Sequence, residues 1–234
     1  MLTARRGKRL EALASELQSR HGISAETLVA DLADPAETDH LAERIGRIDS
    51  LAMLVHSAGF GTLDSFAGKD VEFSVAMVEV HDVVALRLTH AALPAMKARR
   101  QGAIIHVSSI AAFGSGPANV TYGATKAFLN VFCEGLQAEL AGTGVRVQAL
   151  CPGLTRTEFH DTPEYRGFNR GRIPRSFWMT ADEVVVQSLR ALDSGQVVVI
   201  PGLKNRLFVE LIRYGSIRAV ARKVLARLRS PRVR

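Results

Sequence analysis

Tyr122 and Lys126 are the two residues whose types and spacing point most directly to chemistry. They stand four positions apart at the predicted start of a helix, so both side chains leave the same helix face about one turn apart. A tyrosine, with an ordinary pKa of about 10, exchanges protons poorly at neutral pH unless a nearby cation favours its anion. Lys126 supplies that cation, and the hydroxyl of Ser109 is placed to hold the oxygen atom of a substrate.

The pair Tyr-x-x-x-Lys alone has little specificity, because such a pair also occurs on solvated helix faces. The surrounding arrangement is more specific. Ser109 ends the strand-like run AIIHVSS and precedes Tyr122 by thirteen residues. The helix that begins near Tyr122 is followed by a strand-like run, VRVQAL, which leads into Cys151-Pro152-Gly153.

The elements that must position these residues alternate between short apolar runs and longer segments of helical period. This alternation predicts an α/β fold, a doubly wound parallel sheet with helices on both faces. The predicted strands are 27–30, 51–56, 103–107, 145–150 and 197–200. The predicted helices are 8–21, 35–48, 71–99, 122–141 and 181–193. The stretch between Thr157 and Met179 has no clean period and is interpreted as a long functional loop.

The chain resembles the short-chain dehydrogenase/reductase family over most of its length, to about Gly202. The resemblance lies in several segments that occur in the family's order: TARRGKRLEAL, VADLADP, LVHSAGFG, HVSSIAA, YGATK and CPGLTRTEF. It implies a Rossmann-like sheet and transfer of hydride between a nicotinamide cofactor and a substrate carbon. Tyr122 would then be the proton donor or acceptor, Ser109 would hold the substrate oxygen, and Lys126 would lower the tyrosine pKa and bind the nicotinamide ribose.

The resemblance also implies the residues of a cofactor site. Adenine contacts would come from Asp31 and Leu32, and a close backbone approach to the cofactor from Ser57, Ala58 and Gly59. The segment bordering the nicotinamide and the diphosphate would be formed by Pro152, Gly153, Leu154 and Thr157. Arg5 and Arg6 stand where the family's second strand ends, and a basic pair there suits a 2′-phosphate, so we expect NADP rather than NAD. The alternative is that both arginines are surface charges at a helix start.

The chain departs from the family pattern at its beginning. The family starts with a strand and a Gly-rich turn that cradles the pyrophosphate, and neither precedes Met1. In that topology the first strand lies at the centre of the sheet. Without it, we expect the strand before Arg5 and the strand at 27–30 to be unable to pair with the other strands. A start codon assigned too late and a truncated, inactive product are both consistent with this departure.

Two further departures involve histidines. His81 replaces an asparagine that usually anchors a water in the family's proton relay, so we expect either an altered relay or a helix histidine with no catalytic role. His56-Ser57 replaces a usual Asn-Asn pair, which loosens a structural turn.

Composition bounds the remaining possibilities. The formal net charge is +7, but residues 203–234 carry 10 Lys and Arg and one acid, Glu210, so the first 202 residues carry −2. This distribution argues against nucleic-acid binding. The two cysteines show no disulfide or metal-ligand spacing, and no segment has the length of a membrane span, so we expect a cytoplasmic protein without a metal.

We therefore expect one oxidoreductase domain at 1–202, N-terminally incomplete, and a basic amphipathic segment at 203–234. That segment would lie on an anionic membrane surface or pack on the enzyme or a partner subunit. The arginines and aromatic residues at 158–178 suit an acidic substrate with an apolar part, or are solvated.

The function expected from all these features is interconversion of a small carbonyl compound and an alcohol with NADP by a homo-oligomer. The alternative is a truncated, non-catalytic relative with a binding or regulatory role.

Overall fold

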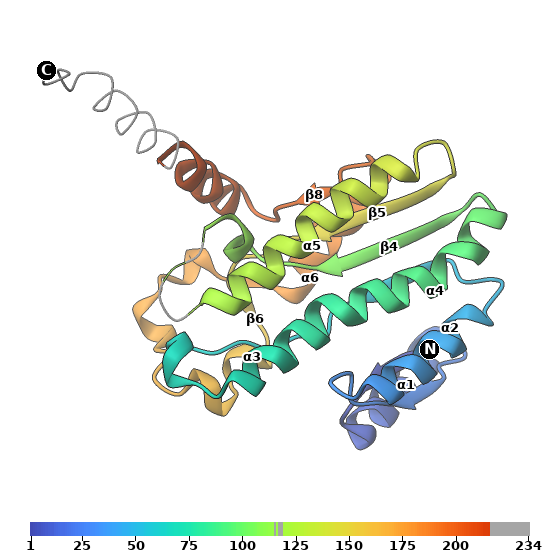
Figure 1. Ribbon diagram of the computed structural model, residues 1–234, viewed down its shortest axis with the longest axis horizontal. Coiled ribbons are helices and arrows are strands. Elements are labelled where there is room, and N and C mark those ends of the chain that lie inside the picture. The colour runs from blue at the N-terminus through green and yellow to red at the C-terminus, as the bar shows by residue number, and fades with distance from the viewer. Residues whose placement is uncertain (115, 117–118, 216–234) are drawn as a thin grey trace, which may run out of the picture.

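The computed structural model describes residues 1–114, 116 and 119–215 (Figure 1). The strands are β1 (Leu2–Ala4), β2 (Thr27–Val29), β3 (Met53–His56), β4 (Gly102–Val107), β5 (Val145–Leu150), β6 (Thr155–Arg156), β7 (Met179–Thr180) and β8 (Val198–Val199). The helices are α1 (Gly7–His21), α2 (Pro35–Gly46), α3 (Val71–Val78), α4 (Val84–Ala98), α5 (Val120–Glu139) and α6 (Ala181–Asp193). Residues 203–215 are also helical.

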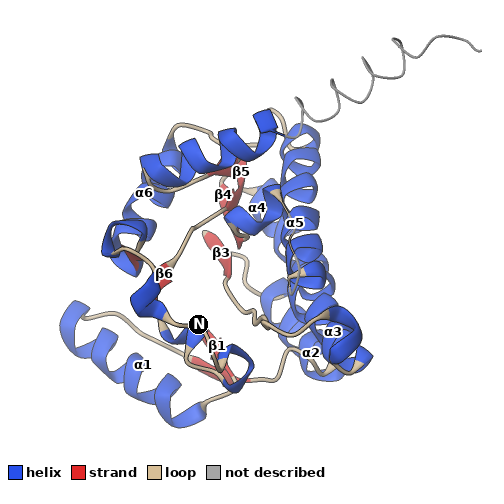
Figure 2. Ribbon diagram, turned by 90° about the vertical axis from the view of Figure 1, so that its left-hand side faces the viewer, coloured by secondary structure: helices blue, strands red, loops and turns tan. Residues whose placement is uncertain are grey.

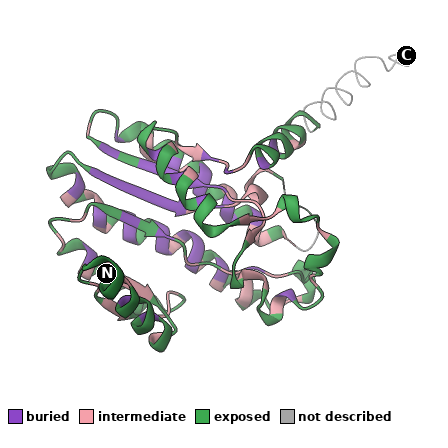
Figure 3. Ribbon diagram, turned by 180° about the vertical axis from the view of Figure 1, so that it is seen from behind, coloured by how far each residue is buried: buried purple, intermediate pink, exposed green. Residues whose placement is uncertain are grey.

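The strands are parallel, and helices cover both faces, as the sequence predicted. The main sheet has the order β3-β4-β5-β8. Helices α2, α4 and α5 lie on one side, and α1 and α6 lie on the other (Figure 2). This is the α/β arrangement in which long apolar strands are buried between two helix layers, and β4 and β5 are accordingly the most buried strands (Figure 3).

Each face of the main sheet has its own apolar core. On one face, Ile104 and Val147 of the sheet pack with Leu88 and Met96 of α4 and with Cys133 of α5. On the other face, side chains of β4, β5 and β8 pack with α6; they are Ala103, Ile105, Leu150, Val184, Leu192 and Val199. The alternation of side chains along each strand separates the two cores.

The sheet is interrupted between β3 and β1. Within the described ranges, β1 and β2 pair only with each other, and β3 pairs only with β4. Val29 of β2 and Val55 of β3 are 55% and 52% exposed, although each belongs to an apolar strand. This agrees with the expectation that the first two strands would not join the rest.

Packing of α2 against α4 connects the β1–β2 sheet to the main sheet. Leu41 and Ile45 of α2 belong to the same core as Val84 and Leu88 of α4. At the surface, the Arg87 guanidinium of α4 forms an ion pair with Asp39 of α2.

The segment predicted as one helix at 71–99 is divided by a π-helical turn, Glu79–Val83, between α3 and α4. A single π turn inserted in a helix is a known feature of functional sites, because it redirects the side chains around it. Here the turn holds His81 and Asp82, both buried. Apolar periodicity does not reveal such a turn, because the pattern resumes after one extra residue.

The helix predicted at 181–193 is confirmed as α6. The side chain of Thr180 before it accepts a hydrogen bond from the Glu183 amide, and the Glu183 carboxylate accepts one from the Thr180 amide.

The helix at 203–215 rests one face on the domain. Asn205 and Val209 are buried, whereas Leu203, Leu207 and Leu211 are more than 60% exposed. The rest of the predicted amphipathic segment, 216–234, lies outside the described residues. None of the described helices combines the length and the apolar character that a membrane span requires. Both expectations for this segment, membrane contact and packing on protein, stay predictions.

The interrupted sheet predicts uneven local stability. Backbone amides of β4, which has a strand on each side, should exchange with solvent far more slowly than those of β1 and β2. Hydrogen–deuterium exchange measured by NMR or mass spectrometry tests this, with β5 as an internal reference. Equal protection of β2 and β4 would show that the two sheets open as one unit.

Candidate active site

The candidate site lies where the strands end. In parallel sheets the carboxyl ends of all strands meet at one edge, where their loops form ligand sites. Ser57–Gly59 follow β3, Ser109 follows β4, and the Pro152–Thr157 segment follows β5. At the second sheet, Arg5 and Arg6 follow β1, and Asp31 and Leu32 follow β2. Every predicted site residue outside helices α3 to α5 therefore stands after the carboxyl end of a strand.

Tyr122 and Lys126 lie in the first turns of α5, and both point toward the end of β4. The Lys126 Nζ lies 5.6 Å from the centre of the Tyr122 ring and donates a hydrogen bond to the Val107 carbonyl at 2.9 Å. Burial lowers the pKa of Lys126 to about 8. Ser108 also connects the end of β4 to α5, because its hydroxyl donates a hydrogen bond to the Lys126 carbonyl.

Ser109 completes the predicted set. Its side chain accepts a hydrogen bond from the Ala111 amide, and its proximity to the Tyr122 side chain lowers the phenol pKa. Burial has the larger effect, however, and raises the pKa of Tyr122 to about 12. The phenol is therefore protonated at neutral pH in this structure, and Lys126 alone does not produce the lowered pKa expected from the sequence.

His81 forms hydrogen bonds with the segment after β3 and with α5. The Phe60 amide donates to His81 Nε2 at 3.1 Å, and His81 Nδ1 lies 2.8 Å from the Thr125 hydroxyl. Because the Thr125 hydroxyl itself donates to the Tyr122 carbonyl, the hydrogen between His81 and Thr125 belongs to Nδ1. Both ring nitrogens are thus occupied, which favours a positioning role for His81 over anchorage of a relay water.

Two glycines allow close packing within the site. A Cβ atom on Gly59 would lie 2.8 Å from His81 Nε2 and 3.5 Å from Lys126 Nζ. A Cβ atom on Gly153 would collide with the Asn205 amide. Asn205 in turn donates to the Pro201 carbonyl at 2.7 Å, so the helix at 203–215 supports the turn after β5. The sequence did not indicate Asn205, because no recognisable motif surrounds it.

Aromatic residues of the 157–178 loop cover the site. Phe159 lies 5.9 Å from Tyr122 and 5.3 Å from Tyr165, measured between ring centres. A Cβ atom on Gly61 would lie 2.5 Å from the Tyr165 hydroxyl, so Gly61 allows the loop to approach Tyr122. The sequence pointed to this loop but not to the contact with Tyr122.

A small open pocket adjoins Tyr122, with about 20 Å³ of free volume, which is room for a water molecule. Its lining includes polar side chains of Thr62, Ser74 and Thr121 and the apolar Phe66 and Met77. Lys69 also lines it, where it forms an ion pair with Asp64 at 3.1 Å.

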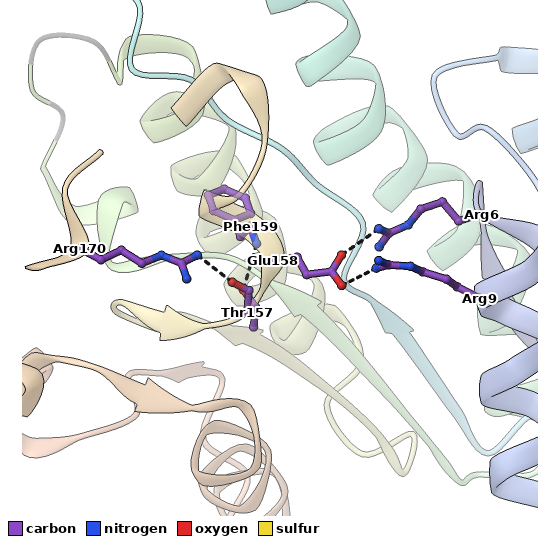
Figure 4. A network of polar contacts seen from close by, with 6 residues as sticks. All are labelled: Arg6, Arg9, Thr157, Glu158, Phe159 and Arg170. Carbon is purple, nitrogen blue, oxygen red and sulfur yellow. Dashed lines mark hydrogen bonds and ion pairs between the residues drawn. The ribbon is translucent and has the colours of Figure 1, made fainter. Parts of the chain in front are cut away.

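The two predicted phosphate contacts, Arg5 and Arg6, differ in their partners. Arg6 forms an ion pair with Glu158 at 2.8 Å, and Arg9 of α1 pairs with the same carboxylate (Figure 4). Arg5 is exposed and forms no ion pair with any of the described residues. In the described part of the chain, no three His, Cys, Asp or Glu side chains are grouped to hold a metal ion.

A buried histidine cluster surrounds Lys126. His106 lies 3.4 Å from His56, between their Nδ1 atoms, and its Nε2 lies 2.9 Å from the Thr89 hydroxyl. Burial lowers the pKa of His56, His81 and His106 to about 4, 2 and 3. Burial also raises the pKa of Asp82 to about 7.

These shifts predict acid lability. Below pH 6.5 these three histidines bind protons in the unfolded chain, whereas in the folded chain they stay neutral. Asp82 has the opposite effect: above pH 3.8 its carboxyl loses its proton in the unfolded chain but keeps it in the folded chain. The net difference of two protons should lower the unfolding free energy by roughly 3 kcal/mol for each pH unit from 6 to 4. Urea denaturation across this range measures the slope.

His56→Asn should reduce the slope by about 1.4 kcal/mol per pH unit. His40→Asn, at an exposed site, is the control and should leave the slope unchanged. An unchanged slope in H56N would contradict this account.

Gly59 provides a second prediction. Gly59→Ala should destabilise the fold by about 1–3 kcal/mol, because the added methyl group presses on His81 and Lys126. Gly135→Ala on α5 is the control, since nothing lies within 4 Å of its Cβ position and alanine favours the helix. Urea midpoints compare the two variants, and a G59A chain as stable as G135A would refute the close approach.

Comparison with known proteins agrees with this geometry. Residues 1–164 match the family model described as short chain dehydrogenase. An uncharacterised oxidoreductase of Staphylococcus saprophyticus is 34% identical over 161 residues, which are 67% of this chain and 68% of that protein. Serine 3-dehydrogenase of Agrobacterium fabrum is 38% identical over 162 residues, 67% of this chain and 62% of that protein. The chain therefore spans less than two thirds of the length of this dehydrogenase.

A solved structure extends the likeness to the whole chain. The short-chain dehydrogenase from Sphingobium yanoikuyae in complex with NADPH superposes with a TM-score of 0.80 and 29% identity, covering 100% of this chain and 87% of that one. The strand order, the loops at the carboxyl edge and these matches lead to one conclusion: the chain belongs to the short-chain dehydrogenase family.

Proposed function

We propose that the chain interconverts a small carbonyl compound and the corresponding alcohol, with Tyr122 as the acid and base. The observation that carries the proposal is the grouping of three side chains at the end of β4. The Ser109 side chain lies close enough to Tyr122 to lower the phenol pKa, and the buried Lys126 ammonium lies one turn further along α5. A hydroxyl, a phenol and a cation so placed can hold a substrate oxygen and exchange a proton with it.

The residues at the carboxyl edge fit a nicotinamide dinucleotide. Gly59 brings its backbone close to Lys126, and Lys126 and Thr157 are the groups we propose to contact the nicotinamide end. Asp31 and Leu32 follow β2 and would contact the adenine. When bound, the cofactor would supply or accept the hydride.

NADP is the form that the charges favour. Arg6 and Arg9 direct two guanidinium groups at one carboxylate, which is the geometry that a phosphate also uses. Arg5, predicted from the sequence, lies next to Arg6 between β1 and α1. The proposal therefore keeps Arg6 and adds Arg9, which sequence reasoning did not select.

The protonation states suit the direction of reduction. Tyr122 is neutral at pH 7, because burial raises its pKa to about 12, so it holds a proton to donate to a carbonyl oxygen. Lys126, with a pKa of about 8, is mostly an ammonium at that pH and stabilises the phenolate left behind. Ser109 would orient the substrate oxygen through its hydroxyl. In the direction of oxidation the same groups would act in reverse.

The pocket beside Tyr122 is small, and its lining favours an uncharged substrate group. Hydroxyl groups and apolar side chains line it, and Asp64 neutralises Lys69. The arginines of the 157–178 loop are exposed, and Arg170 is occupied by Asp161 and the Thr157 carbonyl. These contacts favour the solvated interpretation of the loop arginines over an acidic substrate.

The interrupted sheet favours one alternative, a non-catalytic binding protein. In the described residues β1 and β3 do not pair, so the proposed cofactor contacts stand on two separate sheets. Binding without turnover is the result that this alternative predicts. We also propose self-association, which exposed apolar residues of α4 and α5 such as Leu86, Phe128 and Val131 support.

Tyr122→Phe tests the proposed chemistry. Loss of the phenol hydroxyl should lower the rate of NADPH oxidation with a panel of small aldehydes and ketones by about 10²- to 10⁴-fold. NADPH binding, followed by its fluorescence, should change little. Tyr214→Phe, at an exposed tyrosine outside the site, is the matched control and should keep the wild-type rate.

Turnover by Y122F at the wild-type rate would refute the role of Tyr122. Tight NADPH binding by the wild-type chain with no turnover of any carbonyl in the panel would favour the non-catalytic alternative.

A further inference from the structure

Glu158 joins the cofactor side of the molecule to the 157–178 loop. Its carboxylate lies between the guanidinium groups of Arg6 and Arg9, about 150 residues away in the sequence (Figure 4). Arg6 precedes α1 and Arg9 lies in its first turn, so the contact bridges the β1–β2 unit and the segment that follows β5. The two arginines lower the pKa of Glu158, which is ionised at neutral pH.

The contact is connected to the catalytic tyrosine through the next residue. Phe159 follows Glu158 and packs against the Tyr122 ring at 5.9 Å. The Thr157 hydroxyl accepts a hydrogen bond from the Phe159 amide, and Arg170 donates to the Thr157 carbonyl (Figure 4). Glu158 and Phe159 belong to one short 3-10 turn, Glu158–His160, which Thr157 caps, so we expect displacement of Glu158 to move Phe159 as well.

We propose that Glu158 is an internal competitor for the anion site formed by Arg6 and Arg9, and that a phosphate group bound there releases the 157–178 loop from Tyr122. The inference rests on the proposed use of NADP, whose 2′-phosphate is the competing anion. It assigns Glu158 two effects: it weakens binding of the phosphorylated cofactor, and it keeps Phe159 over the catalytic phenol until that cofactor arrives.

The exposure of the contact makes the exchange feasible. The side chains of Arg6, Arg9 and Glu158 are 64%, 61% and 58% exposed, and ion pairs in such surroundings contribute little to stability. A phosphate carries close to two negative charges and three acceptor oxygens, so it outcompetes one carboxylate for two guanidinium groups. A buried ion pair would resist this exchange.

The loop itself provides two readouts. Trp178, the single tryptophan of the chain, lies in an aromatic cluster with His160 and Phe168, at 5.6 and 6.2 Å between ring centres. Its emission therefore reports movement of the loop. Trypsin cleaves after arginine, and the loop exposes four of them: Arg166, Arg170, Arg172 and Arg175.

The first experiment needs no nucleotide. In the free protein, Glu158→Gln should speed tryptic cleavage within the loop about two- to fivefold and shift the emission of Trp178, because the loop has lost its ionic attachment. Glu164→Gln, the same change at another glutamate of the loop, is the matched control and should behave as wild type. Equal cleavage and emission in E158Q and E164Q would overturn the attachment.

The second experiment measures the competition directly by calorimetric titration with 2′,5′-ADP and with 5′-AMP. E158Q should bind 2′,5′-ADP about two- to fivefold more tightly than wild type and E164Q do, with no change for 5′-AMP. Saturation with 2′,5′-ADP should shift the Trp178 emission of the wild-type chain toward that of E158Q.

Two failures are distinguishable. If wild type prefers 2′,5′-ADP to 5′-AMP but E158Q binds it no more tightly, the competition is wrong and NADP use stands. If no chain distinguishes the two nucleotides, the proposed NADP preference is wrong, and the competition falls with it.

Discussion

The buried ammonium of Lys126 is the interaction on which the rest of the site depends. It is almost fully removed from water, and its contact with the Val107 carbonyl joins α5 to the end of β4. A charge in such a place is costly unless polar groups surround it. The neighbouring histidines stay neutral, because protonating them beside Lys126 would add like charges to a dry environment. Asp82 is the one acid of this cluster, and its charge would favour the ammonium.

The arrangement explains why so many small residues converge there. Gly59 lacks a side chain where His81 and Lys126 need the space, and Gly61 lacks one where Tyr165 approaches Tyr122. The π-helical turn places His81 toward both of these segments. The two glycines and the π-helical turn each interrupt regular structure. Together they place the Tyr122 phenol, the Ser109 hydroxyl and the Lys126 ammonium close to one another.

The other half of the molecule is held more loosely. The β1–β2 unit shares no strand contact with the main sheet in the described residues, and it depends on α2 packing against α4 and on surface ion pairs. Its arginines nevertheless reach the loop that covers Tyr122. A weakly attached unit that carries anion-binding groups is well suited to respond to a ligand, because only small free energies oppose its movement.

The sequence by itself determined the fold class, the alternating elements and the pairing of Tyr122 with Lys126, because helical period, strand length and a four-residue spacing are local properties. It also indicated that the first strands would stay apart from the others. Only the tertiary structure decided that burial dominates the pKa of Tyr122, that both nitrogens of His81 are occupied, and that Glu158 lies on Arg6 and Arg9. Contacts such as Asn205 beneath Gly153 join residues far apart in the chain, and their existence depends on packing and desolvation, which no local pattern encodes.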